Sequence, residues 1–306
     1  MCSYLISVII PCYNAEAYIE QCLKSIYQQT YTNIEVICID NNSTDNTLKK
    51  LYELKNLYPN LIVEEEKRPG ASIARNKGLS IAKGELVQFQ DADDLFMPNK
   101  FEKQILAFHD NTIDIVVSDR VVMNEECNKE LEIHNFSEIE GHEIEVAVSE
   151  VIATGNPLYK REVLNRINGY NEDINSAQDW DLNIRLILNG AKIKYVPGPF
   201  FISRQIPNSL SSNWKKVSLQ GAELLVSYRS RLENLELGVR AQNKICRVLY
   251  ESILWSKDKP EIFINELLFW SEKNNLRYLS PIKRSIATVF GIRSLLNLER
   301  LKQNIL

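Results

Sequence analysis

The chain has 306 residues, of which 44% are hydrophobic and 25% are charged, and its formal net charge is −4. This is the composition of a globular protein long enough for one large or two ordinary domains. The negative balance excludes the broad positive field on which non-specific nucleic-acid binding depends, so we expect no nucleic acid among the partners.

The charge changes sign along the chain. Residues 213–306 contain 16 Lys and Arg against 9 Asp and Glu, a net charge of +7, which leaves −11 for residues 1–212. This shift predicts a boundary near residue 212, between an acidic body and a basic C-terminal extension.

Neither disulfides nor a targeting segment are expected. The cysteines show no Cys-x-x-Cys and no zinc-site spacing, so we interpret them as reduced and mostly buried. The apolar run at residues 5–10 is too short for a signal-peptide core, and no run of roughly 18 apolar residues occurs. We therefore expect a cytoplasmic protein, at most peripheral at the inner face of a membrane. The cysteines are Cys2, Cys12, Cys22, Cys38, Cys127 and Cys246.

Strand and helix patterns alternate through the first 90 residues. Residues 5–11 (LISVIIP) form a continuous apolar run ended by proline, typical of a strand buried on both faces of a parallel sheet. An apolar stripe from Ile19 to Ile26 then predicts a helix, with Asn14 as its N-cap. Further strands are predicted at 34–39, 61–65 and 86–90, and further helices from Ser43 and over 72–82.

This alternation predicts right-handed βαβ units and an α/β fold, with a Rossmann-like, mostly parallel sheet flanked by helices. Residues 100–212 are less regular, with a strand at 113–117 and a helix over 180–189, and we interpret them as the second half of the same domain. From Trp214 onward, apolar residues recur at helical spacing, which predicts a helical extension over 213–306.

Ligands of open α/β sheets bind beyond the carboxyl ends of the strands. Pro11 and Tyr13 follow the first predicted strand, Asp40 follows the second, and Gln90-Asp91-Ala92-Asp93-Asp94 follows the fourth. Three neighbouring carboxylates repel one another unless a cation is present. Their oxygens suit Mg²⁺ or Mn²⁺, with diphosphate oxygens completing the shell. An acidic loop that caps a helix near Asn99 is an equally favoured interpretation.

The other polar segments also allow two interpretations each. Asp40 begins an Asn-rich turn at 40–45, which alone favours ordinary turn chemistry, and Tyr13 either stacks on a base or packs. Gly70 precedes a predicted helix, and Arg75 lies one turn after the start of that helix. The pair could bind an anionic ligand, or Gly70 could form an ordinary turn and Arg75 could lie on the surface. Neither GxGxxG nor GxxxxGK[ST] occurs, so the interpretation of the chain as a nucleotide-dependent oxidoreductase loses its main support.

Gln178-Asp179-Trp180-Asp181 opens the predicted helix at 180–189 with two carboxylates. The helix dipole stabilises acidic groups there, and a carboxylate in this place could also serve as a general base. Because Asp179 and Asp181 are two residues apart, we expect at most one of them to point into a shared cleft.

The order of these motifs resembles the family-2 inverting glycosyltransferases of the GT-A fold. The resemblance covers roughly residues 3–212 and implies a GT-A catalytic domain over 1–212, with a nucleotide-binding half at 1–99 and an acceptor half at 100–212. The extension at 213–306 lies outside it. The matching segments are 7–14 (SVIIPCYN), 40–45 (DNNSTD), 70–76 (GASIARN), 91–94 (DADD), 169–172 (GYNE) and 178–181 (QDWD).

The resemblance implies a role for each matching residue. Nucleotide binding falls to Pro11, Tyr13, Asp40, Arg75 and Asp91, with Tyr13 stacked on uracil and Asp40 bonded to its imide edge. Asp93, together with Asp91, would bind the metal. Asp179 would be the general base, and Trp180 would help to form the wall of the acceptor site. The family often has a histidine shortly after the catalytic helix, where this chain has Ile206, and Arg204 is expected to bind diphosphate in part replacement.

These roles imply a metal-dependent inverting transferase. It would move a sugar from a UDP-sugar to a hydroxyl of a saccharide or lipid-linked acceptor in cell-surface polysaccharide synthesis, with Mn²⁺ or Mg²⁺ stabilising the leaving diphosphate. The alternative is a non-catalytic nucleotide-sugar-binding or scaffold protein of the same fold. The presence of both Asp93 and Asp179 argues against it, because a binding module needs no base.

The end of the chain is basic and amphipathic. Lys283, Arg284 and Arg293 alternate with apolar residues, a pattern that can lie on an anionic membrane. A helix packed on its own domain, or on a second subunit in a homodimer, is at least as favoured. The other residues of this pattern are Ile286, Val289, Phe290, Ile292, Leu295, Leu296, Leu298, Arg300, Leu301 and Lys302.

Overall fold

The computed structural model describes residues 4–58, 60–207, 213–256, 260–275 and 277–303. The chain forms two compact units. The first contains Met1–Glu143 and Val151–Pro207, and the second contains Ile144–Glu150 and Asn208–Leu306.

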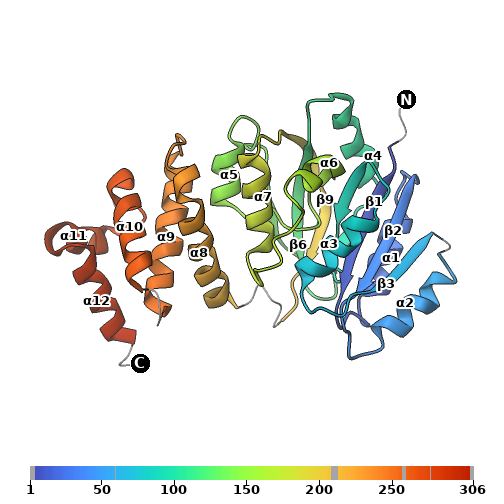
Figure 1. The fold of residues 1–306 in the computed structure, drawn as a ribbon, viewed down its shortest axis with the longest axis horizontal. Helices are drawn as coiled ribbons and strands as arrows, with labels where there is room; N and C mark the ends of the chain where they lie inside the picture. Colours follow the sequence, from blue (N-terminus) through green and yellow to red (C-terminus); the bar gives the residue numbers. More distant parts are fainter. Residues whose placement is uncertain (1–3, 59, 208–212, 257–259, 276, 304–306) are drawn as a thin grey trace. The chain divides into compact units, whose positions relative to one another are not determined.

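The first unit contains one sheet with helices on both faces (Figure 1). Its described residues form nine strands in this sheet. The strands are β1 (Ile6–Cys12), β2 (Ile34–Asp40), β3 (Leu61–Glu65), β4 (Leu86–Phe89), β5 (Leu95–Phe96), β6 (Ile115–Met123), β7 (Glu130–His134), β8 (Leu158–Lys160) and β9 (Ile193–Arg204). The helices are α1 (Ile19–Tyr27), α2 (Thr47–Lys55), α3 (Ala71–Ile81), α4 (Lys100–Ile105), η1 (Leu106–His109), α6 (Arg161–Arg166) and α7 (Gln178–Leu188).

The strand order is β3-β2-β1-β4-β8-β6-β9-β5, with β7 paired to β6. Neighbouring strands from β3 to β4 are parallel, and Ile6 of β1 is registered with Ile34 of β2 and Leu86 of β4. Beyond β4, β8 is antiparallel to both its neighbours, whereas β6 and β9 are parallel. The predicted α/β fold, with parallel strands covered by helices, is confirmed.

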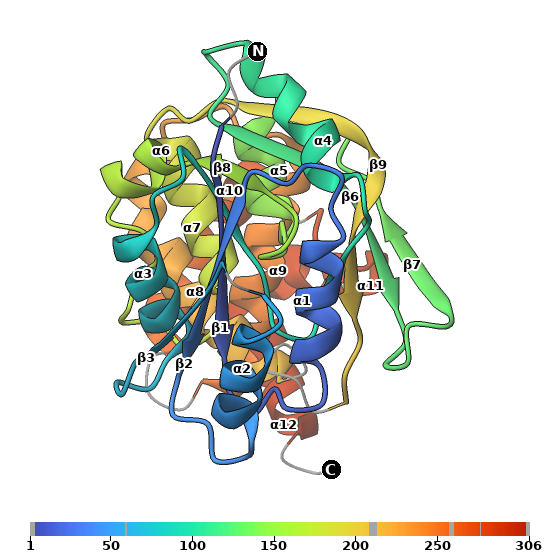
Figure 2. The ribbon, with the colours of Figure 1, turned by 90° about the vertical axis from the view of Figure 1, so that its right-hand side faces the viewer.

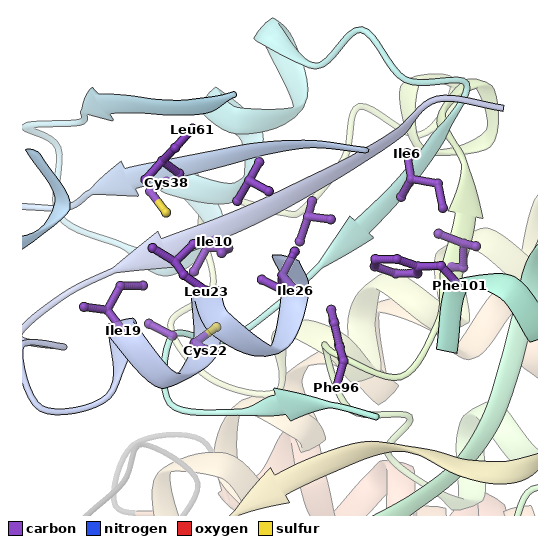
Figure 3. Close-up of a cluster of buried hydrophobic side chains, with 14 of the residues drawn as sticks. Ile6, Ile10, Ile19, Cys22, Leu23, Ile26, Cys38, Leu61, Phe96 and Phe101 are labelled. Carbon is purple, nitrogen blue, oxygen red and sulfur yellow. The ribbon is translucent and has the colours of Figure 1, made fainter. Parts of the chain in front are cut away.

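Strand β1 is buried on both faces, as its continuous apolar sequence predicts. Ile6 and Ile10 pack in the same cluster as the α1 residues Leu23 and Ile26 (Figure 3). On the opposite face α3 comes so close that a Cβ on Gly78 would lie 2.3 Å from Ile9 Cγ2 (Figure 2). This packing holds the carboxyl ends of β1, β2 and β4 at one edge of the sheet.

Two helix starts lie later than predicted. Helix α1 begins at Ile19, after Tyr18, and α2 begins at Thr47 rather than Ser43. Asn14 is therefore not the N-cap of α1. Its backbone is left-handed, with φ of 50°, and its Oδ1 accepts a hydrogen bond of 2.8 Å from Thr44 N. The polar residues before both helices thus form hydrogen bonds between loops, in place of extra helical turns.

The second unit is helical, as predicted for the extension. Within it, Gly238 N and Ala241 N at the start of α9 donate to Glu145 of α5, so a segment far earlier in the chain caps this helix. No helix among the described residues is both long and apolar enough to cross a membrane. The helices are α5 (Glu143–Ser149), α8 (Trp214–Leu232), α9 (Val239–Trp255), α10 (Pro260–Asn274), α11 (Pro281–Phe290) and α12 (Ile292–Gln303).

The basic end of the chain packs within this second unit. Ile292, Leu295 and Leu296 of α12 are buried, and Arg293 pairs with Glu261 of α10 at 3.0 Å. In this part the observed packing matches a helix held on its own unit. The side chains of Ile286, Val289, Phe290, Leu298, Arg300, Leu301 and Lys302 lie outside the described residues.

Candidate active site

Hydrogen bonds tie together the loops that follow β1, β2 and β3. Asn14 after β1 binds Thr44 after β2. Asn41 donates to the carbonyl oxygens of Glu66 and Arg68 at 2.8 and 2.7 Å, and its Oδ1 accepts from Gly70 N at 2.7 Å. The loop before α3 is therefore fixed against the loop after β2.

Two predicted nucleotide-binding residues lie at this edge with free binding capacity. Tyr13 is 63% exposed, which leaves its ring available for stacking, and Pro11 precedes it at the end of β1. Asp40 is buried, and its Oδ2 accepts a hydrogen bond of 3.3 Å from Ser43 N. Its Oδ1 is buried without a hydrogen-bond partner. A buried acceptor of this kind is costly unless a ligand N–H reaches it.

Arg75 of α3 connects the two halves of the unit. It is only 5% exposed, and its guanidinium donates to Asp91 Oδ1 at 2.7 Å and to Gln178 Oε1 at 3.0 Å. It also lies 4.9 Å from the centre of the Tyr170 ring. Burial alone would lower the pKa of Arg75, but the charge of Asp91 and then Tyr170 and Asp179 raise it. Arg75 is therefore a permanent cation between the loop after β4 and the start of α7.

The three carboxylates after β4 have different environments. Arg75 compensates Asp91, and Asp94 is buried and accepts a hydrogen bond of 2.7 Å from Arg204 N. Asp93 forms no ion pair in the described part of the chain. Burial and then the charge of Asp91 raise the pKa of Asp93 to about 6. The repulsion that suggested a metal shared by Asp91 and Asp93 is thus partly relieved by protein groups, and Asp93 keeps the uncompensated charge.

The donor set fits a divalent cation that is shared with a ligand. Among the described residues, no group of three or more His, Cys, Asp or Glu side chains is arranged to hold a metal by itself. Asp93 and Asp91 supply hard oxygen ligands, and Mg²⁺ or Mn²⁺ in such a site completes its shell with phosphate oxygens and water.

Arg204, expected at the diphosphate, is already bound to protein. Its Nε donates to Asp93 O at 2.8 Å, one terminal nitrogen donates to Glu125 O at 2.6 Å, and the other donates to Gln21 Oε1 at 2.8 Å. The guanidinium also lies 5.1 Å from the centre of the Tyr18 ring. These contacts connect the Asp91–Asp94 loop to α1 and to the turn after β6, so the geometry favours a positioning role.

We expect Arg204→Ala to weaken Mn²⁺ binding to the protein–UDP complex about tenfold, because a loop freed at Asp93 loses preorganisation. UDP affinity without metal should stay within about twofold, since no diphosphate contact is lost. Calorimetric titration of both ligands checks this. A large loss of metal-free UDP affinity would show instead that Arg204 binds the diphosphate.

Asp179 lies in the first turn of α7, directly after a strained turn. Ala177 before the helix has φ of 55°, an unusual value for alanine. Asp179 Oδ2 accepts from the Thr154 hydroxyl at 2.7 Å, and Oδ1 accepts from the Tyr170 hydroxyl at 2.9 Å. Burial and the charge of Asp91 raise the pKa of Asp179, against the opposing effect of Arg75 and the two hydroxyls. The result is a more basic carboxylate with a fixed orientation.

Sequence reasoning gave no role to Tyr170 or Thr154. Tyr170 lies in the GYNE segment, and Asn76 holds its backbone, accepting from Tyr170 N at 2.8 Å and donating to Tyr170 O at 2.9 Å. Gly169 has φ of 65°, and a Cβ there would lie 2.4 Å from Asn76 Oδ1, so only glycine fits. The GYNE and GASIARN segments therefore act together to aim Tyr170 at Asp179. Thr154 lies in an irregular segment without a recognisable pattern.

The two residues that follow Asp179 in the QDWD segment are buried. Asp181 is fully buried and pairs with Arg185 at 2.7 Å, so only Asp179 points toward Arg75, as expected from their spacing. Trp180 is 4% exposed. This burial leaves little of its ring for contact with an acceptor, so the predicted acceptor-wall role gains no support.

The site therefore combines an exposed aromatic ring, a buried unpaired acceptor, an uncompensated carboxylate and a basic carboxylate. Arg75 lies between Asp91 and the start of α7. This arrangement can bind an anionic nucleotide at the sheet edge and remove a proton from a hydroxyl that approaches Asp179.

Comparison with known proteins identifies the family. The model named "Glycosyl transferase family 2" matches residues 7–168, more than half of the chain. The glycosyltransferase EpsJ of Bacillus subtilis is 29% identical over 218 residues, covering 68% of this chain and 63% of that protein. The Escherichia coli UDP-Glc:α-D-GlcNAc-diphosphoundecaprenol β-1,3-glucosyltransferase WfgD is 37% identical over 124 residues, covering 40% of this chain and 49% of that protein. The chain thus spans less than two thirds of the length of either relative.

The fold has counterparts among solved structures. The crystal structure of S. aureus TarS 1–349 in complex with UDP-GlcNAc has a TM-score of 0.69 at 20% identity, covering 98% of this chain and 91% of that chain. This likeness shows a shared GT-A fold. Because the family model matches more than half of the chain, the chain belongs to glycosyl transferase family 2.

Proposed function

We propose that this chain is a metal-dependent inverting transferase that moves a sugar from a UDP-sugar to a hydroxyl of a saccharide or lipid-linked acceptor. Cell-surface polysaccharide synthesis is the proposed setting. The names of relatives support the substrate classes, since WfgD uses UDP-glucose and an acceptor joined to diphosphoundecaprenol, and TarS binds UDP-GlcNAc.

The nucleotide side of the proposal rests on Tyr13 and Asp40. The exposed Tyr13 ring offers a stacking surface for a base. The buried, unpartnered Oδ1 of Asp40 is an acceptor for a single N–H, which the imide of uracil provides. Arg75 and the loop from Asp91 to Asp94 then face the ribose and phosphates that follow the base.

The observation on which the proposal chiefly depends is the fixed carboxylate of Asp179. Two hydroxyl donors orient it, and burial makes it a better proton acceptor. The acceptor hydroxyl gives its proton to Asp179 while its oxygen attacks the anomeric carbon on the face opposite the diphosphate. Because one displacement occurs, the configuration at that carbon inverts.

The leaving diphosphate needs its growing charge stabilised. Asp93, aided by Asp91, would hold Mn²⁺ or Mg²⁺, which when bound neutralises charge on the diphosphate oxygens. Arg204 would keep the Asp93 loop in place, and Arg75 adds a fixed positive charge beside Asp91.

Hydrolysis of a panel of nucleotide sugars, with and without Mn²⁺, tests the proposal without a known acceptor. We expect slow release of UDP from at least one UDP-sugar and little release of nucleotide from CDP-sugars, because N3 of uracil carries the N–H that Asp40 would accept, whereas N3 of cytosine carries none. Release should fall at least tenfold when the metal is removed. Equal release with EDTA present, or a preference for CDP-sugars, would contradict the proposal.

A further inference from the structure

Arg120 of β6 has a guanidinium that the protein does not bind. Its side chain is half-buried, and its Nε is buried without a hydrogen bond. Across the described ranges, no ion pair or side-chain hydrogen bond involves Arg120. The other inward-facing arginines of this unit, Arg75, Arg185 and Arg204, each donate to several protein oxygens. Arg120 therefore differs from every arginine with a clear structural role in this region.

Sheet pairing and side-chain contacts place Arg120 near the segment that holds the proposed base. Arg120 lies opposite Phe201 in the pairing of β6 with β9. The Phe201 ring is so close to Gly155 that a Cβ there would lie 2.2 Å from Phe201 Cε2. Gly155 follows Thr154, whose hydroxyl donates to Asp179. Asp179 is also among the carboxylates whose charge acts on Arg120.

Carboxylates near Arg120 are already bound elsewhere. Burial lowers the pKa of Arg120, while the charges of Asp94, Glu132 and Asp179 raise it. Asp94 accepts from Arg204 N, Asp179 accepts from two hydroxyls, and Glu132 lies 3.2 Å from the imidazole of His134. The guanidinium stays protonated because arginine does not lose its proton in proteins. A half-buried cation without a close partner is unfavourable until an anion binds it.

We propose that Arg120 is the binding site for an anionic oxygen on the sugar substrate, a phosphate or carboxylate group close to the hydroxyl that Asp179 deprotonates. The inference rests on the proposed function. It adds a substrate feature, because the proposal already assigns the donor diphosphate to Asp93 and Arg75. The planar fork of arginine binds two oxygens of such a group at once. Sugar hydroxyls alone would leave the charge unneutralised.

The test compares charged and neutral sugars on the full chain saturated with UDP and Mn²⁺. The probes are glucose 1-phosphate and glucuronic acid, with methyl glucoside as the neutral counterpart, and calorimetry measures their affinities. We expect the charged sugars to bind about tenfold more tightly than methyl glucoside. Arg120→Gln should abolish this preference, and Arg120→Lys should keep part of it. Arg166→Gln, at an exposed arginine of α6, should keep all of it.

A second arm locates the anion on the donor or the acceptor. If the anion belongs to the transferred sugar, the wild type hydrolyses UDP-glucuronate faster than UDP-glucose, and Arg120→Gln removes that difference. If neither arm shows a preference for the charged sugar, the inference is overturned. It is also overturned if the preference persists in Arg120→Gln and thermal melting shows that this variant is folded. If the preference depends on Arg120 while no UDP-sugar is hydrolysed, the anion site stands and the proposed transfer fails.

Discussion

Replacing Asp179 with asparagine should lower kcat by roughly 10²–10⁴-fold, the usual effect of removing a general base. Asparagine keeps the shape of the side chain and can still accept from Tyr170, and the Thr154 hydroxyl can turn to pair with the new amide. The loss should therefore come from chemistry, with UDP affinity nearly unchanged. Steady-state kinetics and UDP titration measure the two quantities.

The pH profile gives an independent check on the same residue. The pKa of Asp179 is raised, so its base form is lost as the pH falls, starting at higher pH than for an ordinary aspartate. In the wild type, kcat/KM should therefore begin to fall at a correspondingly higher pH as the solution is made more acidic. In Asp179→Asn this decrease should be absent. Asp173→Asn, an exposed change on the loop before α7, serves as the matched control and should keep both this decrease and the rate. Unchanged turnover in Asp179→Asn would reject the assignment.

Replacing Asp93 with asparagine should have opposite effects on activity and stability. Metal-dependent turnover should fall at least 10²-fold, because the carboxylate that would hold the cation is gone. The pKa of Asp93 is about 6 in the folded chain and about 4 when unfolded. Its contribution to stability is therefore present below about pH 4 and is lost as the pH rises through 6.

At pH 7 the metal-free variant should accordingly be more stable than the wild type, by on the order of 1–2 kcal/mol after allowing for partial exposure. The difference should become much smaller at pH 4, where Asp93 is protonated in the folded chain and only about half ionised in the unfolded chain. Chemical denaturation with EDTA at the two pH values measures it. Equal stabilities at pH 7 would mean that Asp93 has a compensating partner when no metal is bound.

The first half of the fold was predictable because it depends on local pattern. Strands β1, β2 and β4 are rich in apolar residues, and the intervening helices show apolar stripes at helical spacing. Polar side chains directly after such strands must meet at one sheet edge, which is why Tyr13, Asp40 and the Asp91–Asp94 loop could be grouped from sequence.

The rest depends on contacts between distant segments. Nothing local in residues 144–150 indicates that they pack with the C-terminal helices. The environment of Asp179 requires Thr154 and Tyr170, which come from irregular segments. The pairing of Asp91 with Arg75 was also hidden, and it changes the electrostatic argument. Repulsion within the DADD segment alone overstated the need for a cation at Asp91, whereas Asp93 has no ion-pair partner among the described residues.

The central claim is that the charge of Asp93 is balanced by a divalent cation bound together with the nucleotide diphosphate. Calorimetric titration of UDP into the wild-type protein, with and without Mn²⁺, tests it most directly. The account predicts at least tenfold tighter UDP binding with Mn²⁺, an equal gain in Mn²⁺ affinity with UDP, and loss of both in Asp93→Asn. The same UDP affinity with and without the metal would contradict it.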